Sequence, residues 1–155
     1  MVKLLLAGTG LIGHRHMQHI LEHPDLELVG IIDPIITDEK IEGVKTYSSL
    51  SDVNKHADGI ILATPTETHA DLTIQSLEMG LHVLVEKPVA ASLLEADKMI
   101  SASEKTGLSV LVGHHRRHHP LVNETIKILN SGKIGRPVAA SLMWLMRKQD
   151  EYFDV

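Results

Sequence analysis

The feature that most constrains the fold is a glycine-rich segment near the N-terminus. Residues 8–13 read Gly-Thr-Gly-Leu-Ile-Gly and fit the pattern G-x-G-x-x-G. The apolar run at residues 3–7 precedes them, and the run Leu11–Glu22, with apolar residues at helical spacing, follows. A buried strand, a glycine turn and a helix in this order open a βαβ unit, in which the helix N-terminus can bind a phosphate group.

The positions of this segment have expected tasks in binding a dinucleotide. Gly8 permits the tight turn, Gly10 lets the backbone approach a pyrophosphate closely, and Gly13 lets the helix pack against the strand. Unpaired N–H groups at the start of the helix then face the phosphates. The cofactor-binding residues expected in this segment are Gly8, Thr9, Gly10, Leu11, Ile12 and Gly13.

Asp33, directly after the second apolar run Leu26–Ile32, indicates which dinucleotide is bound. It comes twenty residues after the last glycine, where a carboxylate accepts hydrogen bonds from the ribose hydroxyls. Because the same carboxylate repels a 2′-phosphate, we expect NAD rather than NADP, although Lys40 and Lys45 could supply a phosphate contact. The simpler alternative is a glycine turn between two buried elements, with Asp33 as a turn former before Pro34.

The rest of the chain alternates strand-like and helix-like runs. This alternation predicts βαβ units and a doubly wound parallel sheet of the Rossmann α/β class. Loops that follow parallel strands then share one edge of the sheet, where ligands bind. Strands are expected at residues 3–7, 26–32, 44–47, 59–63, 82–85 and 109–112. Helices are expected at residues 11–22, 48–55, 66–79, 92–107 and 120–130, with residues 35–43 unassigned.

The last part of the chain breaks this pattern. Residues 137–146 form a strand-like apolar run that no helix follows. We expect this run to be the first strand of a second α/β domain whose remainder is absent. The expected division is a Rossmann domain at residues 1–120, then a connecting helix and the start of a substrate or dimerisation domain at residues 121–155.

Three further segments, together with the glycine loop, resemble a known family. They are Thr64-Pro65-Thr66 followed by His69, Gly80-Leu81-His82-Val83, and Val85-Glu86-Lys87-Pro88. In this order they resemble the Gfo/Idh/MocA oxidoreductases, the relatives of glucose–fructose oxidoreductase and inositol dehydrogenase. The resemblance implies a Rossmann domain, a C-terminal α/β domain on a large open sheet, and hydride transfer between NAD(P) and a hydroxyl carbon of a sugar, polyol or related small molecule.

The resemblance also implies roles for single residues. Lys87 corresponds to a family lysine that contacts the nicotinamide ribose and orients or protonates the reacting oxygen, and a cation there stabilises a developing alkoxide. Glu86 is expected to help hold the cofactor, and Thr64 and Pro65 to line its ribose and pyrophosphate side. His69 matches a frequent family histidine, for which a structural hydrogen bond to the neighbouring loop explains as much as cofactor contact. The alternative for the lysine motif is a surface Glu-Lys pair after a strand.

A histidine-rich run, His114-His115-Arg116-Arg117-His118-His119, follows the last expected strand of the Rossmann domain. We expect no metal here, because adjacent histidines point in different directions, no i, i+4 pair is accompanied by a carboxylate, and the chain has no cysteine. By resemblance, Arg117 lies near the nicotinamide or substrate, and His114 and His115 face the substrate entrance. The second catalytic group of the family, a histidine with an aspartate nearby, is expected beyond Val155.

Composition argues against several classes of function. The 155 residues carry a formal net charge of −5 and only 3% aromatic side chains, which argues against nucleic-acid binding. No apolar run approaches the ~20 residues of a membrane helix, and the opening run is too short for a signal peptide. Zero cysteines fit a reducing compartment, so we expect a cytoplasmic protein.

Three functions stay open at this point. The first is the cofactor-binding part of an NAD-dependent oxidoreductase, which by itself would bind NAD but turn over little substrate. The second is a stand-alone NAD-binding regulatory or sensor module without catalysis. The third is an interaction protein whose last strand dimerises by sheet addition. In the first case the expected partner is a small sugar- or polyol-like substrate, with homo-oligomers formed through the sheet of the missing domain.

Overall fold

The structure is a computed structural model that describes residues 1–54, 56–143, 145 and 147. The chain divides into two units, of which the first spans Met1–His114 and the second begins at His115. No helix in the described part of the chain is long and apolar enough to cross a membrane.

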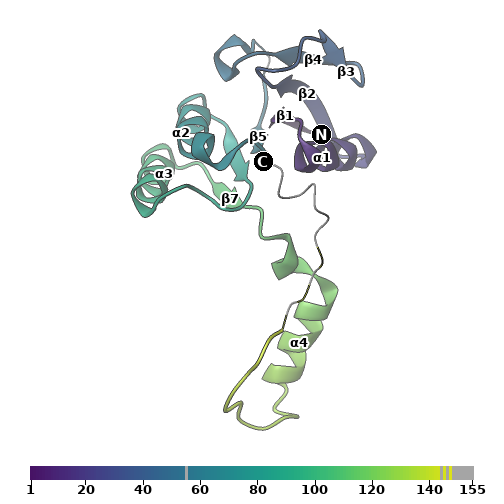
Figure 1. Ribbon diagram of the computed structural model, residues 1–155, viewed down its shortest axis with the longest axis vertical. Helices are drawn as coiled ribbons and strands as arrows, with labels where there is room; N and C mark the ends of the chain where they lie inside the picture. Colours follow the sequence, from purple (N-terminus) through teal and green to yellow (C-terminus); the bar gives the residue numbers. More distant parts are fainter. Residues whose placement is uncertain (55, 144, 146, 148–155) are drawn as a thin grey trace. The chain divides into compact units, whose positions relative to one another are not determined.

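Within the described residues, the first unit is built on one seven-stranded sheet. The strands are β1 (Val2–Ala7), β2 (Leu26–Ile32), β3 (Lys40–Ile41), β4 (Val44–Tyr47), β5 (Gly59–Leu62), β6 (His82–Val85) and β7 (Val110–Val112). Their order is β3-β4-β2-β1-β5-β6-β7 (Figure 1), and all neighbours pair in parallel except β3 and β4, which are antiparallel. Without β3 this is the 3-2-1-4-5-6 order of the Rossmann sheet, so the predicted fold class is confirmed.

Helices cover both faces of this sheet. α1 (Leu11–Glu22) lies against one face, and α2 (His69–Glu78) and α3 (Leu93–Thr106) lie against the other (Figure 1). Successive side chains of β1 point to opposite faces. Leu6 therefore packs in the apolar cluster of α1, whereas Leu5 packs in the cluster of α2 and α3. Burial on both faces explains why the central strands read as uninterrupted apolar runs.

The buried stripe of α1 is narrower than the sequence pattern predicts. Gly13, Met17 and Ile20 are buried, but Ile12 and Leu21 are 40% and 48% exposed. Both exposed residues fall at the margins of the stripe centred on the three buried positions. Apolar spacing alone therefore does not give the width of the buried face of this helix.

The connection from β2 to β4 contains a hairpin in place of a crossover helix. The segment left unassigned, residues 35–43, includes β3, which pairs with β4. Glu42 and Gly43 form the turn with φ values of 49° and 79°, as a two-residue type I′ turn requires. The outer edge of the sheet on this side is therefore a short two-stranded ribbon.

Two predicted helices are shorter in the structure. The helix expected at residues 48–55, whose last residue lies outside the described part, is a 3₁₀ turn at Leu50–Asp52. The helix expected from Thr66 begins at His69, after a 3₁₀ turn at Thr66–Thr68. Such turns are frequent at helix N-termini, and the residue pattern does not separate them from the α-helix that follows.

The second unit contains a 3₁₀ turn at His115–His118 and α4 (Pro120–Asn130). Residues 137–143 and 145 lie in no helix or strand. The strand predicted at residues 137–146 is therefore wrong at these positions, while residues 144 and 146 lie outside the described residues. A strand is defined by hydrogen bonds to a neighbour, and none of the described strands pairs with this segment.

Candidate cofactor-binding site

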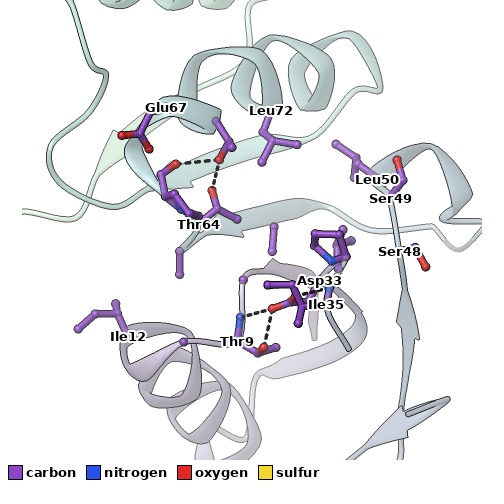
Figure 2. Close-up of a pocket in the computed structure, with 18 of the residues that line it drawn as sticks. Thr9, Ile12, Asp33, Ile35, Ser48, Ser49, Leu50, Thr64, Glu67 and Leu72 are labelled. Atoms are coloured by element: carbon purple, nitrogen blue, oxygen red, sulfur yellow. Dashed lines mark hydrogen bonds between the residues drawn. The ribbon is translucent and has the colours of Figure 1, made fainter. Parts of the chain in front are cut away.

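A cavity opens at the sheet edge where β1, β2 and β5 end. Its volume is about 820 Å³, within the range of ~300–1,000 Å³ usual for ligand sites. β1 continues through α1 to β2 on one side, whereas β5 lies on its other side. The cavity therefore occupies the point where the strand order reverses, which is where open α/β sheets bind ligands. Figure 2 shows Thr9 and Asp33 on one side of it and Thr64 and Leu72 on the other.

The glycine loop presents an uncapped helix N-terminus to this cavity. Gly10 is the N-cap of α1 and has no side chain to bond the first helical N–H groups. The first turn carries no acidic residue, and no atom lies within 4 Å of the place that a Cβ on Gly10 would occupy. Free donors and a partial positive charge with open space in front of them suit a phosphate or pyrophosphate group.

The other two glycines of the loop are packed tightly. A Cβ on Gly8, whose φ is +88°, would lie 2.5 Å from the carbonyl oxygen of Ala63. A Cβ on Gly13 would lie 2.0 Å from the carbonyl oxygen of Gly8. These contacts leave no room for any side chain, so they hold the first turn of α1 against the ends of β1 and β5.

Asp33 follows β2, and its carboxylate is fixed by the glycine loop. Oδ2 accepts hydrogen bonds from the N–H of Thr9 at 3.0 Å and from the Thr9 hydroxyl, and Oδ1 accepts one from the N–H of Ile35 at 3.0 Å. Burial raises the pKa of Asp33, but the bonds from the Thr9 hydroxyl, the Ile35 amide and the Thr9 amide outweigh it and lower the pKa below its ordinary 3.8. A carboxylate offers about four acceptor positions. About one position is therefore open to a ligand hydroxyl.

The opposite wall comes from the loop between β5 and α2. The hydroxyl of Thr68 lies 2.7 Å from the Thr64 hydroxyl and 2.8 Å from the carbonyl oxygen of Pro65 (Figure 2). These bonds tie the loop to the 3₁₀ turn before α2. Thr64 and Pro65 thereby form a fixed surface facing the glycine loop.

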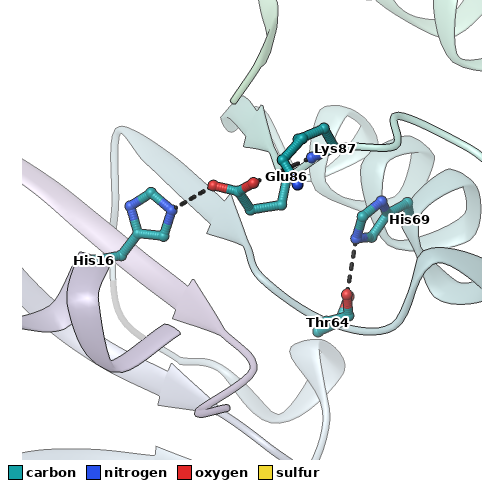
Figure 3. Close-up of polar contacts among 5 residues, drawn as sticks. All are labelled: His16, Thr64, His69, Glu86 and Lys87. Atoms are coloured by element: carbon teal, nitrogen blue, oxygen red, sulfur yellow. Dashed lines mark hydrogen bonds and ion pairs between the residues drawn. The ribbon is translucent and has the colours of Figure 1, made fainter. Parts of the chain in front are cut away.

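Glu86 and Lys87 lie at the end of the neighbouring strand. The N–H of Glu86 donates to the carbonyl oxygen of Leu62 at 2.9 Å, which places this segment beside the end of β5. Oε1 of Glu86 lies 3.0 Å from Nε2 of His16, and Oε2 accepts from the N–H of Lys87 at 3.2 Å (Figure 3). The Lys87 side chain is exposed, and its ammonium makes no ion pair with the described residues.

His69 is buried and bridges two loops. Its side chain is 1% exposed, with Nε2 2.9 Å from the carbonyl oxygen of Thr64 and Nδ1 2.9 Å from that of Pro88 (Figure 3). Both ring nitrogens are thus occupied by backbone groups. The geometry is that of the structural hydrogen bond to the neighbouring loop, one of the two explanations given for this histidine.

The cavity brings together only part of the predicted site. The predicted residues that line it are Gly8, Thr9, Gly10, Leu11, Ile12, Asp33, Thr64 and Pro65. Those outside its lining are Gly13, His69, Glu86 and Lys87. His114 is exposed after β7 in the first unit, whereas His115 and Arg117 are exposed residues of the second unit.

Sequence reasoning missed one wall of the cavity. The residues that line it without having been predicted include Ile35, Ser48, Ser49, Leu50, Glu67, Thr68, Asp71 and Leu72. Residues 48–50 directly follow β4, so the rule that singled out the other strand ends could have found them. His16 was missed because its partner Glu86 lies 70 residues away in the sequence.

Comparison with known proteins agrees with this geometry. The model of the Gfo/Idh/MocA oxidoreductases, described as an oxidoreductase family with an NAD-binding Rossmann fold, matches residues 2–114. The 4-carboxy-2-hydroxymuconate-6-semialdehyde dehydrogenase of Sphingobium sp. is 33% identical over 127 residues, which are 77% of this chain and 40% of that protein. The scyllo-inositol 2-dehydrogenase (NAD(+)) of Bacillus subtilis is 30% identical over 147 residues, 88% of this chain and 42% of that protein.

Two solved structures share the fold. The WlbA dehydrogenase of Bordetella pertussis, in complex with NADH and UDP-GlcNAcA, is 30% identical with a TM-score of 0.79 over 87% of this chain and 41% of its own. The myo-inositol 2-dehydrogenase of Lactobacillus plantarum is 26% identical with a TM-score of 0.80 over 87% of this chain and 42% of its own. The chain spans about two fifths of the length of the relatives it matches. It belongs to the Gfo/Idh/MocA family of oxidoreductases, and residues 2–114 are an NAD-binding Rossmann domain.

Proposed function

We propose that this chain is the cofactor-binding part of an NAD-dependent dehydrogenase that acts on a hydroxyl carbon of a sugar, polyol or related small molecule. One observation carries the proposal: the cavity at the switch point has an uncapped helix N-terminus and an ionised Asp33 on the same side. The inositol dehydrogenases among the relatives support the substrate class.

The residues of the cavity fit NAD in one orientation. The N–H groups at the start of α1 hold the pyrophosphate, and the free acceptor position of Asp33 takes a hydroxyl of the adenosine ribose. A 2′-phosphate would instead meet the negative charge of Asp33, which favours NAD over NADP. The wall that includes Ser49 and Leu50 lies beyond Asp33 (Figure 2), and we assign the adenine end to it.

Lys87 is assigned to the nicotinamide end. Bound NAD supplies the carbon that accepts or returns the hydride. Lys87 follows the end of β6, beside the end of β5, and its ammonium donates a hydrogen bond to the reacting oxygen and stabilises negative charge on it. The relatives are longer than this chain, and we place the substrate contacts and the second acid–base group in that additional length.

Calorimetric titration of the purified chain with NAD and NADP tests the proposal. We expect NAD to bind more tightly than NADP. Asp33→Ala should weaken NAD binding about 10- to 100-fold, the loss expected for a hydrogen bond to a charged group, and should weaken NADP less. Asp25→Ala, which changes an exposed aspartate just before the other end of β2, is the matched control and should leave both affinities unchanged.

Two results would contradict this assignment in different ways. If the wild-type chain bound neither dinucleotide, the proposed function would fail. If Asp33→Ala weakened NAD and NADP equally, the cavity would stand but Asp33 would not be its ribose contact.

A further inference from the structure

His16 makes a contact that links two distant parts of the chain. It lies on α1, one turn after Gly13, and its Nε2 is 3.0 Å from Oε1 of Glu86. The two side chains are 22% and 16% exposed. Because a carboxylate only accepts hydrogen bonds, Nε2–H of His16 is the donor. The neighbouring histidines on α1, His14 and His19, are exposed.

Both oxygens of the Glu86 carboxylate have partners in this chain. Its second oxygen accepts from the N–H of Lys87 at 3.2 Å. A Cβ on Gly113, after β7, would lie only 2.9 to 3.1 Å from the carboxyl atoms, so the glycine makes room for this side chain. Glu86 therefore has one well-defined position, set by α1, by its own backbone and by the end of β7.

The helix that supplies His16 is itself fixed. The first turn of α1 is locked against β1 by the tight packing of Gly13 on Gly8. The same turn carries the N–H groups assigned to the pyrophosphate. α1 therefore has two tasks. Its first residues carry the N–H groups assigned to the pyrophosphate, and its His16 contacts the Glu86–Lys87 segment (Figure 3).

We propose that His16 is a positioning residue for the nicotinamide end of the site. Through Glu86 it fixes the backbone that carries Lys87. The position of Lys87 is thereby fixed relative to α1, the helix to which we assign the pyrophosphate. The inference rests on the proposed function, because it needs NAD in the cavity and Lys87 beside the nicotinamide ribose. His16 does not touch the cofactor, so its effect passes through Lys87.

Two ligands separate positioning from general stability. NADH has both the nucleotide and the nicotinamide end, whereas ADP lacks the nicotinamide ring and its ribose. His16→Leu should weaken NADH binding about tenfold, the loss of one charge-assisted contact, and should change ADP binding less than about twofold. His16→Gln, whose amide nitrogen can donate in place of Nε2, should restore most of the NADH affinity. His19→Leu, on the exposed side of the same helix, is the control and should change neither.

A double-variant comparison tests the route through Lys87. Lys87→Met should by itself weaken NADH binding and spare ADP binding, and adding His16→Leu should then cause no further loss, since coupled residues are not additive. Glu86→Gln approaches the same contact from its other partner and should reproduce the selective loss of NADH. It also serves as the measured variant if His16→Leu does not fold.

The outcomes are distinct. Equal loss of NADH and ADP binding in both His16→Leu and Glu86→Gln would show a merely structural contact and overturn the inference, as would no loss of either. Additive losses in the double variant would also overturn it. A wild-type chain that binds neither NADH nor ADP would overturn the proposed function itself.

Discussion

Thr9 occupies a position at which the pattern G-x-G-x-x-G allows any residue, yet it lowers the pKa of the Asp33 carboxyl group. Its hydroxyl and its N–H both donate to Oδ2 of Asp33. Burial alone would raise the pKa of Asp33, and these bonds with that of Ile35 reverse the effect. The charge to which we assign dinucleotide selection is therefore held by the loop to which we assign the phosphates.

Thr9→Val removes the hydroxyl and keeps the side-chain shape, so burial weighs more and the pKa of Asp33 should rise relative to wild type. In wild type the contribution of Asp33 to stability is fully present above pH 3.8 and is lost as the pH falls through the lowered folded-state pKa. In Thr9→Val the contribution should be smaller and should be fully lost at a higher pH, because the folded-state pKa is raised toward 3.8. Carbon-13 NMR titration of the Asp33 carboxyl and urea unfolding at acid pH measure both effects. Thr9→Ser should behave as wild type, and an unchanged pKa in Thr9→Val would contradict the explanation.

His69 tests a purely structural prediction. His69→Phe keeps an aromatic ring of similar size but removes both ring nitrogens, so the N–H that the imidazole offers to the carbonyl oxygen of Thr64 or of Pro88 is lost. Each buried group left without a partner costs about 1–3 kcal/mol in the free energy of unfolding. Urea denaturation measures the loss, with His19→Phe on the exposed side of α1 as control. A loss no larger than that of the control would show that water replaces the imidazole.

At the scale of elements, two helices that begin in different ways have different tasks. α3 begins with a capping box, in which the Ser92 hydroxyl accepts from the N–H of Glu95 and the Glu95 carboxylate accepts from the N–H of Ala91. α1 begins at Gly10 without any side-chain cap. The sequence distinguishes the two helices. In a capping box, side chains of the helix itself bond its first N–H groups, whereas a glycine leaves those N–H groups available to a ligand.

Gly10→Val and Ser92→Ala should therefore give opposite results. Gly10 has φ −62° and ψ −174°, which any residue adopts, and free space around it. Gly10→Val should keep the melting temperature while lowering NAD affinity at least tenfold, because the new side chain occupies the pyrophosphate position. Ser92→Ala should lower stability by about 1 kcal/mol and leave NAD binding unchanged. Differential scanning calorimetry of both variants measures the melting temperature, and titration measures the NAD affinity. If Gly10→Val bound NAD with wild-type affinity, the phosphate could not bind at the N-terminus of α1.

At the scale of the whole molecule, local sequence patterns predicted the central strands of the sheet. They failed for segments whose structure depends on hydrogen bonds to a neighbouring strand. β1, β2, β5 and β6 are apolar runs between turn residues, so their positions could be read directly. β3 has only two residues and depends on the turn at Glu42-Gly43. The run at residues 137–146 has strand composition but no described partner, and composition cannot supply one.

The candidate site divides in the same way. The glycine loop and Asp33 could be predicted because their spacing reflects one βαβ unit. The wall at residues 48–50 follows a strand end and could have been found by the same rule, whereas the His16–Glu86 contact joins segments that only the folded sheet brings together. Such contacts leave no local signal, and a single sequence does not contain the information that pairs them.

The central pairing has a consequence for how the chain is made. Leu4 of β1 lies beside Gly59 of β5, and Ala7 lies beside Leu62. A nascent chain that has been synthesised only as far as β4 therefore lacks the wall of the cavity that follows β5. We therefore expect NAD to bind only after β5 has joined β1. A ligand that binds only the folded form stabilises it by about 2.7 kcal/mol at a hundred times its Kd. NAD should thus protect from unfolding and proteolysis only those chains that have completed the sheet.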